Sequence, residues 1–115
     1  MTAYIPDRGE VVWINFDPSA GHEQSGRRPA IVLSPRGYNK PSGLGLFCPV
    51  SNRTKGYPFE VQLPDGSPVT GVVLLDQVRS LDWRSRRAVF IGNLDEEVLV
   101  ELMERLRPLI VMDDE

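Results

Sequence analysis

The sequence predicts a mainly β protein with one C-terminal helix, folded as a small, strongly curved antiparallel barrel. Apolar runs along the chain are short and separated by Gly, Pro, Asn and Ser, which is the pattern of strands and turns. Only the C-terminal part of the chain shows a helical period. Several short strands followed by one amphipathic helix are typical of such a barrel with the helix packed against it. At 115 residues, 41% of them hydrophobic, residues 1–115 are expected to form one domain.

Six segments are predicted to be strands. Glu10–Phe16 is rich in β-branched and aromatic residues. Pro29–Ser34 has the composition of a strand buried on both faces, with Pro29 at its start, where a missing N–H is tolerated. Phe59–Leu63 alternates apolar and polar residues, so one of its faces should be exposed. The other strand regions are Leu44–Val50, Arg87–Ile91 and Val69–Val78, which Gly71 interrupts.

The C-terminal helix is predicted from one apolar stripe, made of Val98, Leu99, Leu102, Met103 and Leu106. Asn93 or Asp95 can cap its start, and the acidic residues of the first turn suit the helix dipole. Pro108 is expected to end or kink the helix near Arg107.

Composition excludes several classes of protein. Cys48 is the only cysteine and His22 the only histidine, so neither an intramolecular disulfide nor a structural zinc site is expected. The first ten residues contain no apolar signal-peptide segment, and no apolar run approaches the length of a membrane span. We therefore expect a cytoplasmic protein with no membrane partner.

Charge is distributed unevenly along the chain. The formal net charge is −3, but residues 95–115 carry eight acidic residues against two arginines, so residues 1–94 are net basic. Between His22 and Lys55, six basic residues accompany the single acid Glu23. A local basic surface suits phosphate binding, and a solvated loop face explains it equally well. The acidic tail suits a solubilising role, or a role in repelling nucleic acid from other faces and seating partners.

Three polar segments could carry chemistry: Gly21–Arg28, Ser51–Tyr57 and Asp76–Arg87. In a small barrel, loops that are distant in sequence can meet on one rim. Together these segments supply carboxylates, an imidazole, guanidinium groups and hydroxyls, from Glu23, Asp76, His22, Arg28, Arg53, Arg79, Arg84, Ser51 and Thr54. Arginine presents a planar fork that matches two phosphate oxygens, and a nearby carboxylate can accept a proton from an attacking hydroxyl. This inventory suits phosphate chemistry, and no cluster has the spacing of metal ligands.

Each candidate also has a structural interpretation. Glu23 could form only a surface ion pair with the neighbouring arginines, contributing ~0–1 kcal/mol. His22 could be an ordinary surface histidine, and Asp76 a carboxylate that stabilises a turn. Four aromatic residues could stack on bases but fit core, interface or strand-entry positions as well: Trp13, Trp83, Tyr57 and Phe59.

Four segments in the same order resemble the MazF/PemK/Kid toxins of bacterial toxin–antitoxin pairs: "GEVVWINFDPSAGHEQSGRRPAIVLSP", "YNK", "CPVSNRTKGYPFEV" and "GVVLLDQVRSLDWRSR". The match runs from about Tyr4 to Ile110 and is closest to the MazF branch. The resemblance implies an SH3-like barrel, a homodimer, and sequence-specific, ribosome-independent cleavage of single-stranded RNA without metal or other cofactor. The implied products carry a 2′,3′-cyclic phosphate (or 3′-phosphate) and a 5′-hydroxyl. A cognate antitoxin would bind the dimer and associate it indirectly with DNA.

The resemblance also implies catalytic roles. Glu23 and Arg28 match the catalytic glutamate and arginine of the MazF branch. Ser51 stands where the family often has a threonine, so the hydroxyl is kept but the methyl that fixes its rotamer is lost. We expect Glu23 to accept the proton of the ribose 2′-hydroxyl and Arg28 to bind the phosphate oxygens. The residues expected to contact RNA are Gln24, Arg27, Arg53, Lys55, Arg79 and Arg84.

His22 and Asp76 are secondary catalytic candidates, because they match a histidine and an aspartate of the Kid branch. That branch also has an arginine two residues before the aspartate, and Leu74 stands there in this chain. The Glu23–Arg28 arrangement is therefore favoured, with His22 or water protonating the leaving oxygen.

Two other functions stay open at this level. Toxins of similar fold bind DNA gyrase without hydrolysis, but they depend on an aromatic C-terminal end, whereas this chain ends in "LIVMDDE". A family member that only binds RNA is the second, since Ser51 and Leu74 depart from the family patterns.

Overall fold

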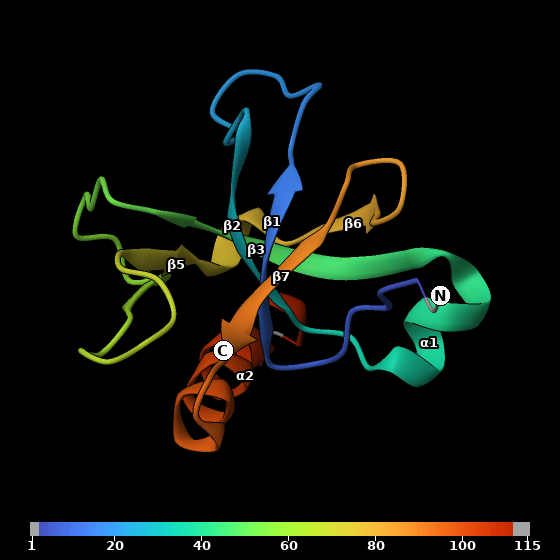
Figure 1. Ribbon diagram of the computed structural model, residues 1–115. Coiled ribbons are helices and arrows are strands. Elements are labelled where there is room, and N and C mark those ends of the chain that lie inside the picture. The colour runs from blue at the N-terminus through green and yellow to red at the C-terminus, as the bar shows by residue number, and fades with distance from the viewer. Residues whose placement is uncertain (1–2, 112–115) are drawn as a thin grey trace.

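The computed structural model describes residues 3–111. All of its strand pairs are antiparallel, in the order β4-β5-β3-β2-β1-β7, with β6 also pairing with β3 (Figure 1). The seven strands are β1 (Glu10–Asn15), β2 (Arg27–Val32), β3 (Leu44–Ser51), β4 (Glu60–Gln62), β5 (Val72–Leu74), β6 (Arg79–Asp82) and β7 (Val89–Asn93).

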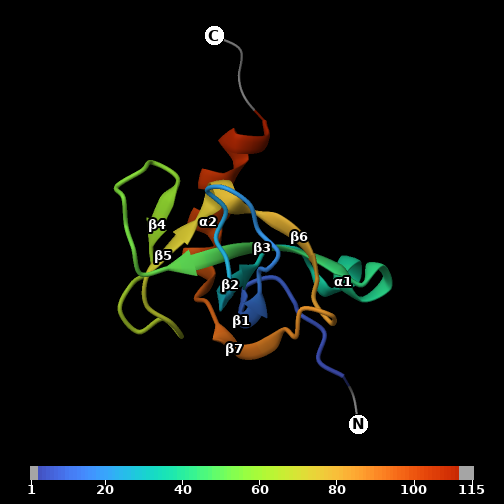
Figure 2. The same ribbon diagram turned by 90° about the horizontal axis from the view of Figure 1, so that it is seen from above.

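The long strand β3 is the point at which the sheet turns. One of its edges pairs with β2, and the other pairs with β6 over Leu44–Phe47 and with β5 at Val50 and Ser51. Because two strands share one edge, the sheet divides there and curves into a barrel-like body, which is visible from above in Figure 2. The predicted mainly β fold with a C-terminal helix is therefore confirmed.

The core consists of two apolar clusters on opposite faces of the central strands. Side chains alternate between faces along a strand, so Val11 enters the cluster that α2 (Glu96–Ile110) covers, and Val12 enters the other. Residues Ala30 to Val32 of β2 are completely buried, which confirms the predicted strand with two buried faces. In β4, Val61 is buried and Gln62 exposed, which confirms the predicted alternation.

The predicted apolar stripe of α2 faces the core. Leu102 and Leu106 are buried, and Val98 and Met103 pack against the same cluster. Asp95 is the N-cap residue, although its side chain makes no capping hydrogen bond. Pro108 was expected to end or kink the helix near Arg107; the helix does not end there but continues to Ile110. Pro108 lies in the last turn, where its missing N–H removes only one terminal bond.

All six predicted strands differ from the observed ones by at least one residue in their bounds, and two of these differences have a clear physical reason. β2 begins at Arg27, so Pro29 is its third residue and not its first. The position tolerates proline because β3 pairs with β2 only from Ala30 onward, which leaves β1 as the single neighbour there. The expected strand over Val69–Val78 shortens to Val72–Leu74, since residues Leu75–Gln77 turn into the 3₁₀ helix η1.

Besides η1, two elements were not predicted. Helix α1 (Arg36–Ser42) contains a glycine and a proline, so its composition does not predict a helix. Buried Asn39 stabilises it, donating to the carbonyls of Pro6 and Ser34. Strand β6 lies within a segment expected to be a polar loop, because only Leu81 of its four residues is buried. Within residues 3–111, neither α-helix has the length and apolar character required to cross a membrane. The last acidic residues of the tail, Asp113, Asp114 and Glu115, lie outside the described residues.

Candidate active site

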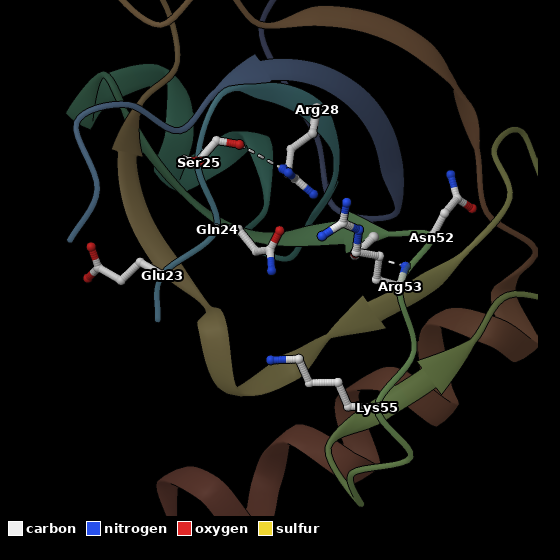
Figure 3. Close-up of a pocket in the computed structure, with 8 residues that line it drawn as sticks. Glu23, Gln24, Ser25, Arg28, Asn52, Arg53 and Lys55 are labelled. Atoms are coloured by element: carbon white, nitrogen blue, oxygen red, sulfur yellow. Dashed lines mark hydrogen bonds between the residues drawn. The ribbon is translucent and has the colours of Figure 1, made fainter. Parts of the chain in front are cut away.

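A cavity of about 530 Å³ lies between the β1–β2 loop and the loop that follows β3 (Figure 3). The two loops are distant in sequence but adjacent in space, because β2 and β3 are neighbouring strands. The lining residues are Glu23, Gln24, Ser25, Arg28, Ser51, Asn52, Arg53 and Lys55. The structure therefore brings the three primary catalytic candidates together with three of the six residues expected to contact RNA.

Arg28 is the second residue of β2, and backbone carbonyls orient its guanidinium group. Its Nε donates to the carbonyl of Ser25 at 3.0 Å, and its Nη1 donates to the carbonyl of Val50 at 3.4 Å. The guanidinium is thus tethered to both segments that line the cavity. An arginine held in this way remains charged and can present its remaining donors to an anion.

The carboxylate of Glu23 is turned away from the cationic groups of the cavity. Its Oε1 accepts from the backbone N–H of Ala20 at 2.6 Å. Figure 3 shows the side chain pointing away from Arg28 and Lys55, whose charged ends point into the cavity. Among residues 3–111 Glu23 makes no ion pair, so the simple surface salt bridge considered for it does not form. A rotation of this side chain is required before it can reach a group beside Arg28.

Ser51 ends β3 and is buried, with 7% of its surface exposed. Its Oγ accepts from the backbone N–H of Arg53 at 3.1 Å. This bond orients the hydroxyl oxygen and so substitutes for the rotamer restraint that a threonine methyl would supply.

Gly71 is packed against the backbone of Ser51. A Cβ atom at position 71 would lie 2.5 Å from the Ser51 carbonyl oxygen, and the φ of Gly71 is +125°. Only glycine fits both the close approach and this backbone conformation. The glycine that interrupts the predicted strand therefore positions the end of β3, a role that the sequence pattern did not reveal.

The loop carrying Arg53 and Lys55 is held by Glu60, which the sequence analysis did not single out. The carboxylate of Glu60 accepts from the hydroxyl of Thr54 at 2.7 Å and from the backbone N–H groups of Lys55 and Gly56 at 3.0 Å. The Thr54 bond, followed by the backbone bonds, lowers the pKa of Glu60. A carboxylate a few residues after a glycine turn was the only available signal for this contact.

A second hollow of about 280 Å³ adjoins the cavity and shares Gln24, Arg53 and Lys55 with it. Its wall includes His22, Asp76 and Tyr57. The secondary catalytic candidates are therefore adjacent to the cavity but do not line it with Arg28. Lys55 Nζ lies 6.0 Å from the centre of the Tyr57 ring, which is half exposed.

The remaining three arginines expected to contact RNA lie elsewhere. Arg27 donates to the carbonyls of Arg86 and Arg87, the latter at 2.8 Å. Arg79 donates to the carbonyl of Phe16 at 2.8 Å and so supports the start of the β1–β2 loop. Arg84 packs over Trp83, with its guanidinium carbon 5.4 Å from the ring centre. Their side chains were expected at the same rim, but backbone carbonyls and an aromatic ring hold them away from it.

Of the aromatic candidates, Trp83 is a core residue, whereas Trp13, Tyr57 and Phe59 are exposed to a third or more. Burial raises the pKa of the Cys48 thiol to about 12, so this cysteine is an inert core residue. Over residues 3–111, no three His, Cys, Asp or Glu side chains are grouped in a way that could hold a metal ion.

Comparison with known proteins identifies the family. The family described as PemK-like, MazF-like toxin of type II toxin–antitoxin system matches residues 7–110. The chain belongs to this family. It is 44% identical over 110 residues to the endoribonuclease toxin MazF of Escherichia coli K12, with 96% of this chain and 98% of the relative covered. It is 38% identical to the endoribonuclease toxin ChpB of the same organism, with 90% and 93% covered.

Solved structures of this toxin family have the same fold. The crystal structure of MazF (Form-I) from Deinococcus radiodurans superposes with a TM-score of 0.89 at 56% identity, covering 94% of this chain and 98% of that one. A MazE-MazF complex (Form-II) from the same organism matches with a TM-score of 0.83 at 50% identity, covering 96% and 100%. The resemblance to MazF-type toxins and the small barrel-like fold are therefore both confirmed.

Proposed function

We propose that this protein is the toxin of a type II toxin–antitoxin pair and an endoribonuclease that cleaves single-stranded RNA at a specific sequence, independently of the ribosome and without a metal ion. The observation that carries the proposal is the cavity in which Arg28, Arg53 and Lys55 converge beside the hydroxyl of Ser51 and the loop of Glu23. Three cations around one polar cavity fit a phosphodiester. The family names and the MazE-MazF complexes support the toxin and antitoxin roles.

The proposed reaction begins at the ribose 2′-hydroxyl. Its oxygen attacks the adjacent phosphorus in line, its proton passes to Glu23, and the bond from phosphorus to the 5′-oxygen breaks. The products are a 2′,3′-cyclic phosphate (or the 3′-phosphate formed by its hydrolysis) and a 5′-hydroxyl. The leaving oxygen takes a proton from His22, in the adjoining hollow, or from water. Arg28 is a poor proton donor because its guanidinium stays protonated at any accessible pH, so its role is mainly electrostatic.

The phosphate is held by donors that the fold already orients. Arg28 is fixed at Nε and Nη1 by two carbonyls, so its other N–H groups can bind the charge that accumulates on the phosphate oxygens. The Ser51 oxygen accepts one bond from Arg53, which leaves its O–H free to rotate toward the same oxygens. Glu23 must leave the N–H of Ala20 and turn inward, so substrate binding and alignment of the base are expected to occur together.

The expected RNA substrate follows from this site, and the expected protein partners follow from the family. An unpaired strand can place its scissile phosphate against Arg28 with the flanking bases over the second hollow, whereas a paired A-form helix opposes in-line geometry, so duplex RNA should resist cleavage. A cognate antitoxin would bind a homodimer of the toxin and block the RNA site, and would associate the pair with DNA.

The test is cleavage of long single-stranded RNA in excess EDTA, with a second substrate carrying a 2′-deoxyribose at the cut site. We expect discrete cuts that survive EDTA, disappear with the deoxy sugar and leave 5′-hydroxyl ends. Sequenced ends also give the recognition sequence. Cleavage that EDTA abolishes, or that the deoxy substrate still undergoes, would refute the metal-independent 2′-hydroxyl mechanism. Intact RNA under all conditions would instead favour a toxin that acts by binding gyrase, or a family member that only binds RNA.

A further inference from the structure

Gln77 makes two hydrogen bonds to the β1–β2 loop, which carries His22, Glu23 and Gln24 and is called the catalytic loop below. Its Oε1 accepts from the backbone N–H of Gln24 at 2.7 Å, and its Nε2 donates to the backbone carbonyl of His22 at 3.1 Å. These two contacts flank Glu23 on both sides. Gln77 itself lies more than fifty residues further along the chain, in η1, so the bonds join two segments that only the tertiary fold brings together.

The chemistry of the amide makes this contact a rigid one. The oxygen and nitrogen of a glutamine side chain lie on one planar group, so the two bonds fix a backbone donor and a backbone acceptor relative to each other. The backbone on either side of Glu23 is thereby held, while the side chain of Glu23 can still rotate. Figure 3 shows this side chain pointing away from Arg28, so it has to rotate in order to act as the proposed base.

The element that carries Gln77 is well anchored. Leu75, at the start of η1, is completely buried and belongs to the core cluster beneath α2. Its backbone N–H donates to the carbonyl of Phe59 at 3.0 Å. A side chain fixed to a rigid element can set the position of a loop more accurately than another loop residue can.

Gln77 does not line the cavity that contains Arg28, but forms part of the wall of the adjoining hollow. It is half-buried, and each polar atom of its amide already makes one bond to the catalytic loop. These contacts indicate that Gln77 positions the loop and does not itself touch the reacting phosphate.

We propose that Gln77 is a positioning residue for catalysis, which fixes the main chain at His22 and Gln24 so that Glu23 turns into the cavity from a defined point. This inference rests on the proposed ribonuclease function, because it assigns to Glu23 the role of the base. Loss of the two bonds leaves the cations that bind the phosphate in place. It therefore affects the chemical step and not the binding of RNA.

The test compares Gln77→Met, which keeps the side-chain length but removes both bonds, with the control Ser67→Ala. Ser67 also donates to a backbone carbonyl, that of Pro64 at 2.7 Å, but in the β4–β5 hairpin and outside the residues that line the cavity. We expect kcat of Gln77→Met to fall roughly 10- to 100-fold, because a small misplacement of a reacting group lowers the rate by about that factor. KM, the affinity for uncleavable 2′-deoxy RNA and the cut sequence should stay unchanged. Ser67→Ala should keep the kcat of the wild type.

Two further measurements make the test specific to Glu23. In a Glu23→Gln background, Gln77→Met should add almost no further loss of rate, because both changes disable the same base. Amide proton exchange at Gln24 should accelerate in Gln77→Met, since its N–H loses the acceptor. If Gln77→Met does not fold, Gln77→Ala serves in its place with the same expected results, since it also removes both bonds.

The results that overturn the proposal are distinct. Unchanged exchange at Gln24 refutes the contact itself, whether or not the protein cleaves RNA. Unchanged kcat with weakened RNA binding or an altered cut sequence shows that Gln77 reads the RNA directly. Fully additive losses with Glu23→Gln show that it does not act through the base. A wild-type protein that cleaves no RNA refutes the proposed function, and the Gln24 exchange then still decides whether the loop is held.

Discussion

Replacement of Gly71 by alanine tests the claim that this glycine positions Ser51. The added Cβ would lie 2.5 Å from the Ser51 carbonyl oxygen and 3.0 Å from the Asn52 side-chain oxygen, while φ at position 71 stays at +125°. The backbone conformation alone costs a non-glycine residue about 1–3 kcal/mol. Overpacking against a backbone that cannot move freely adds roughly another 1–3 kcal/mol.

Gly66 offers a matched control, because its φ is +90° and its Cβ would meet nothing within 4 Å. Gly66→Ala therefore carries only the conformational cost, and the difference between the two variants isolates the contact with Ser51. We expect Gly71→Ala to be less stable than Gly66→Ala by roughly 1–3 kcal/mol in urea unfolding. The rate of RNA cleavage by its folded fraction should also fall, whereas Gly66→Ala should keep the wild-type rate.

Equal free energies of unfolding and equal cleavage rates for the two variants would refute this reasoning. That result would mean that the backbone at Ser51 yields without cost, and that its position does not matter for the reaction. A loss of stability with full activity would confirm the packing and refute only the catalytic part of the argument.

Three further predictions concern the loops around the cavity. Because the Thr54 bond lowers the pKa of Glu60, the carboxylate should hold the Lys55 loop at neutral pH, and release it only when acid brings the pH down to that lowered pKa. The NMR chemical shift of the Lys55 amide should change with pH around that lowered pKa, and in Glu60→Gln this pH-dependent change should be absent. A midpoint at or above the ordinary glutamate pKa would contradict this prediction. If the Ser51 hydroxyl binds the phosphate, Ser51→Ala should lower kcat roughly 10²–10³-fold, while Ser51→Thr should keep the wild-type activity. Equal rates for the wild type and both variants would exclude a role of the hydroxyl in binding the phosphate. Arg79→Met should destabilise the protein without changing the salt dependence of RNA affinity, because its guanidinium binds backbone carbonyls; a shallower dependence would indicate a phosphate contact.

The sequence predicted those elements whose signal is local and periodic. The stripe of α2 and the double burial of β2 follow from apolar spacing alone, and both are present. Helix α1 was missed because its sequence, "RGYNKPS", contains a glycine and a proline, which disfavour a helix. The tertiary hydrogen bonds of Asn39 compensate for this low helix propensity. The end of α2 was misplaced because a proline in a final turn costs less than one in a helix interior.

The residue types of the site were predictable, but the directions of the side chains were not. Arg28 and Ser51 were found through motif resemblance, and the structure brings them together. Arg27 and Arg79 carry the same guanidinium group, yet both are bound to carbonyls of distant loops. No local pattern encodes such partners. Gln77 and Glu60 were missed for the same reason, because each acts through main-chain groups that only the fold brings within reach.

The central claim is that Arg28 stabilises a phosphate undergoing attack in the cavity. The most direct test is the single-turnover rate of RNA cleavage in EDTA for the wild type, Arg28→Ala and Arg105→Ala. Arg105 lies on α2 in an exposed ion pair with Glu101. Arg105→Ala therefore controls for the loss of one positive charge outside the cavity. We predict that Arg28→Ala loses roughly 10²–10³-fold in rate and remains folded, while Arg105→Ala retains the wild-type rate. Equal rates for Arg28→Ala and the wild type would contradict the account.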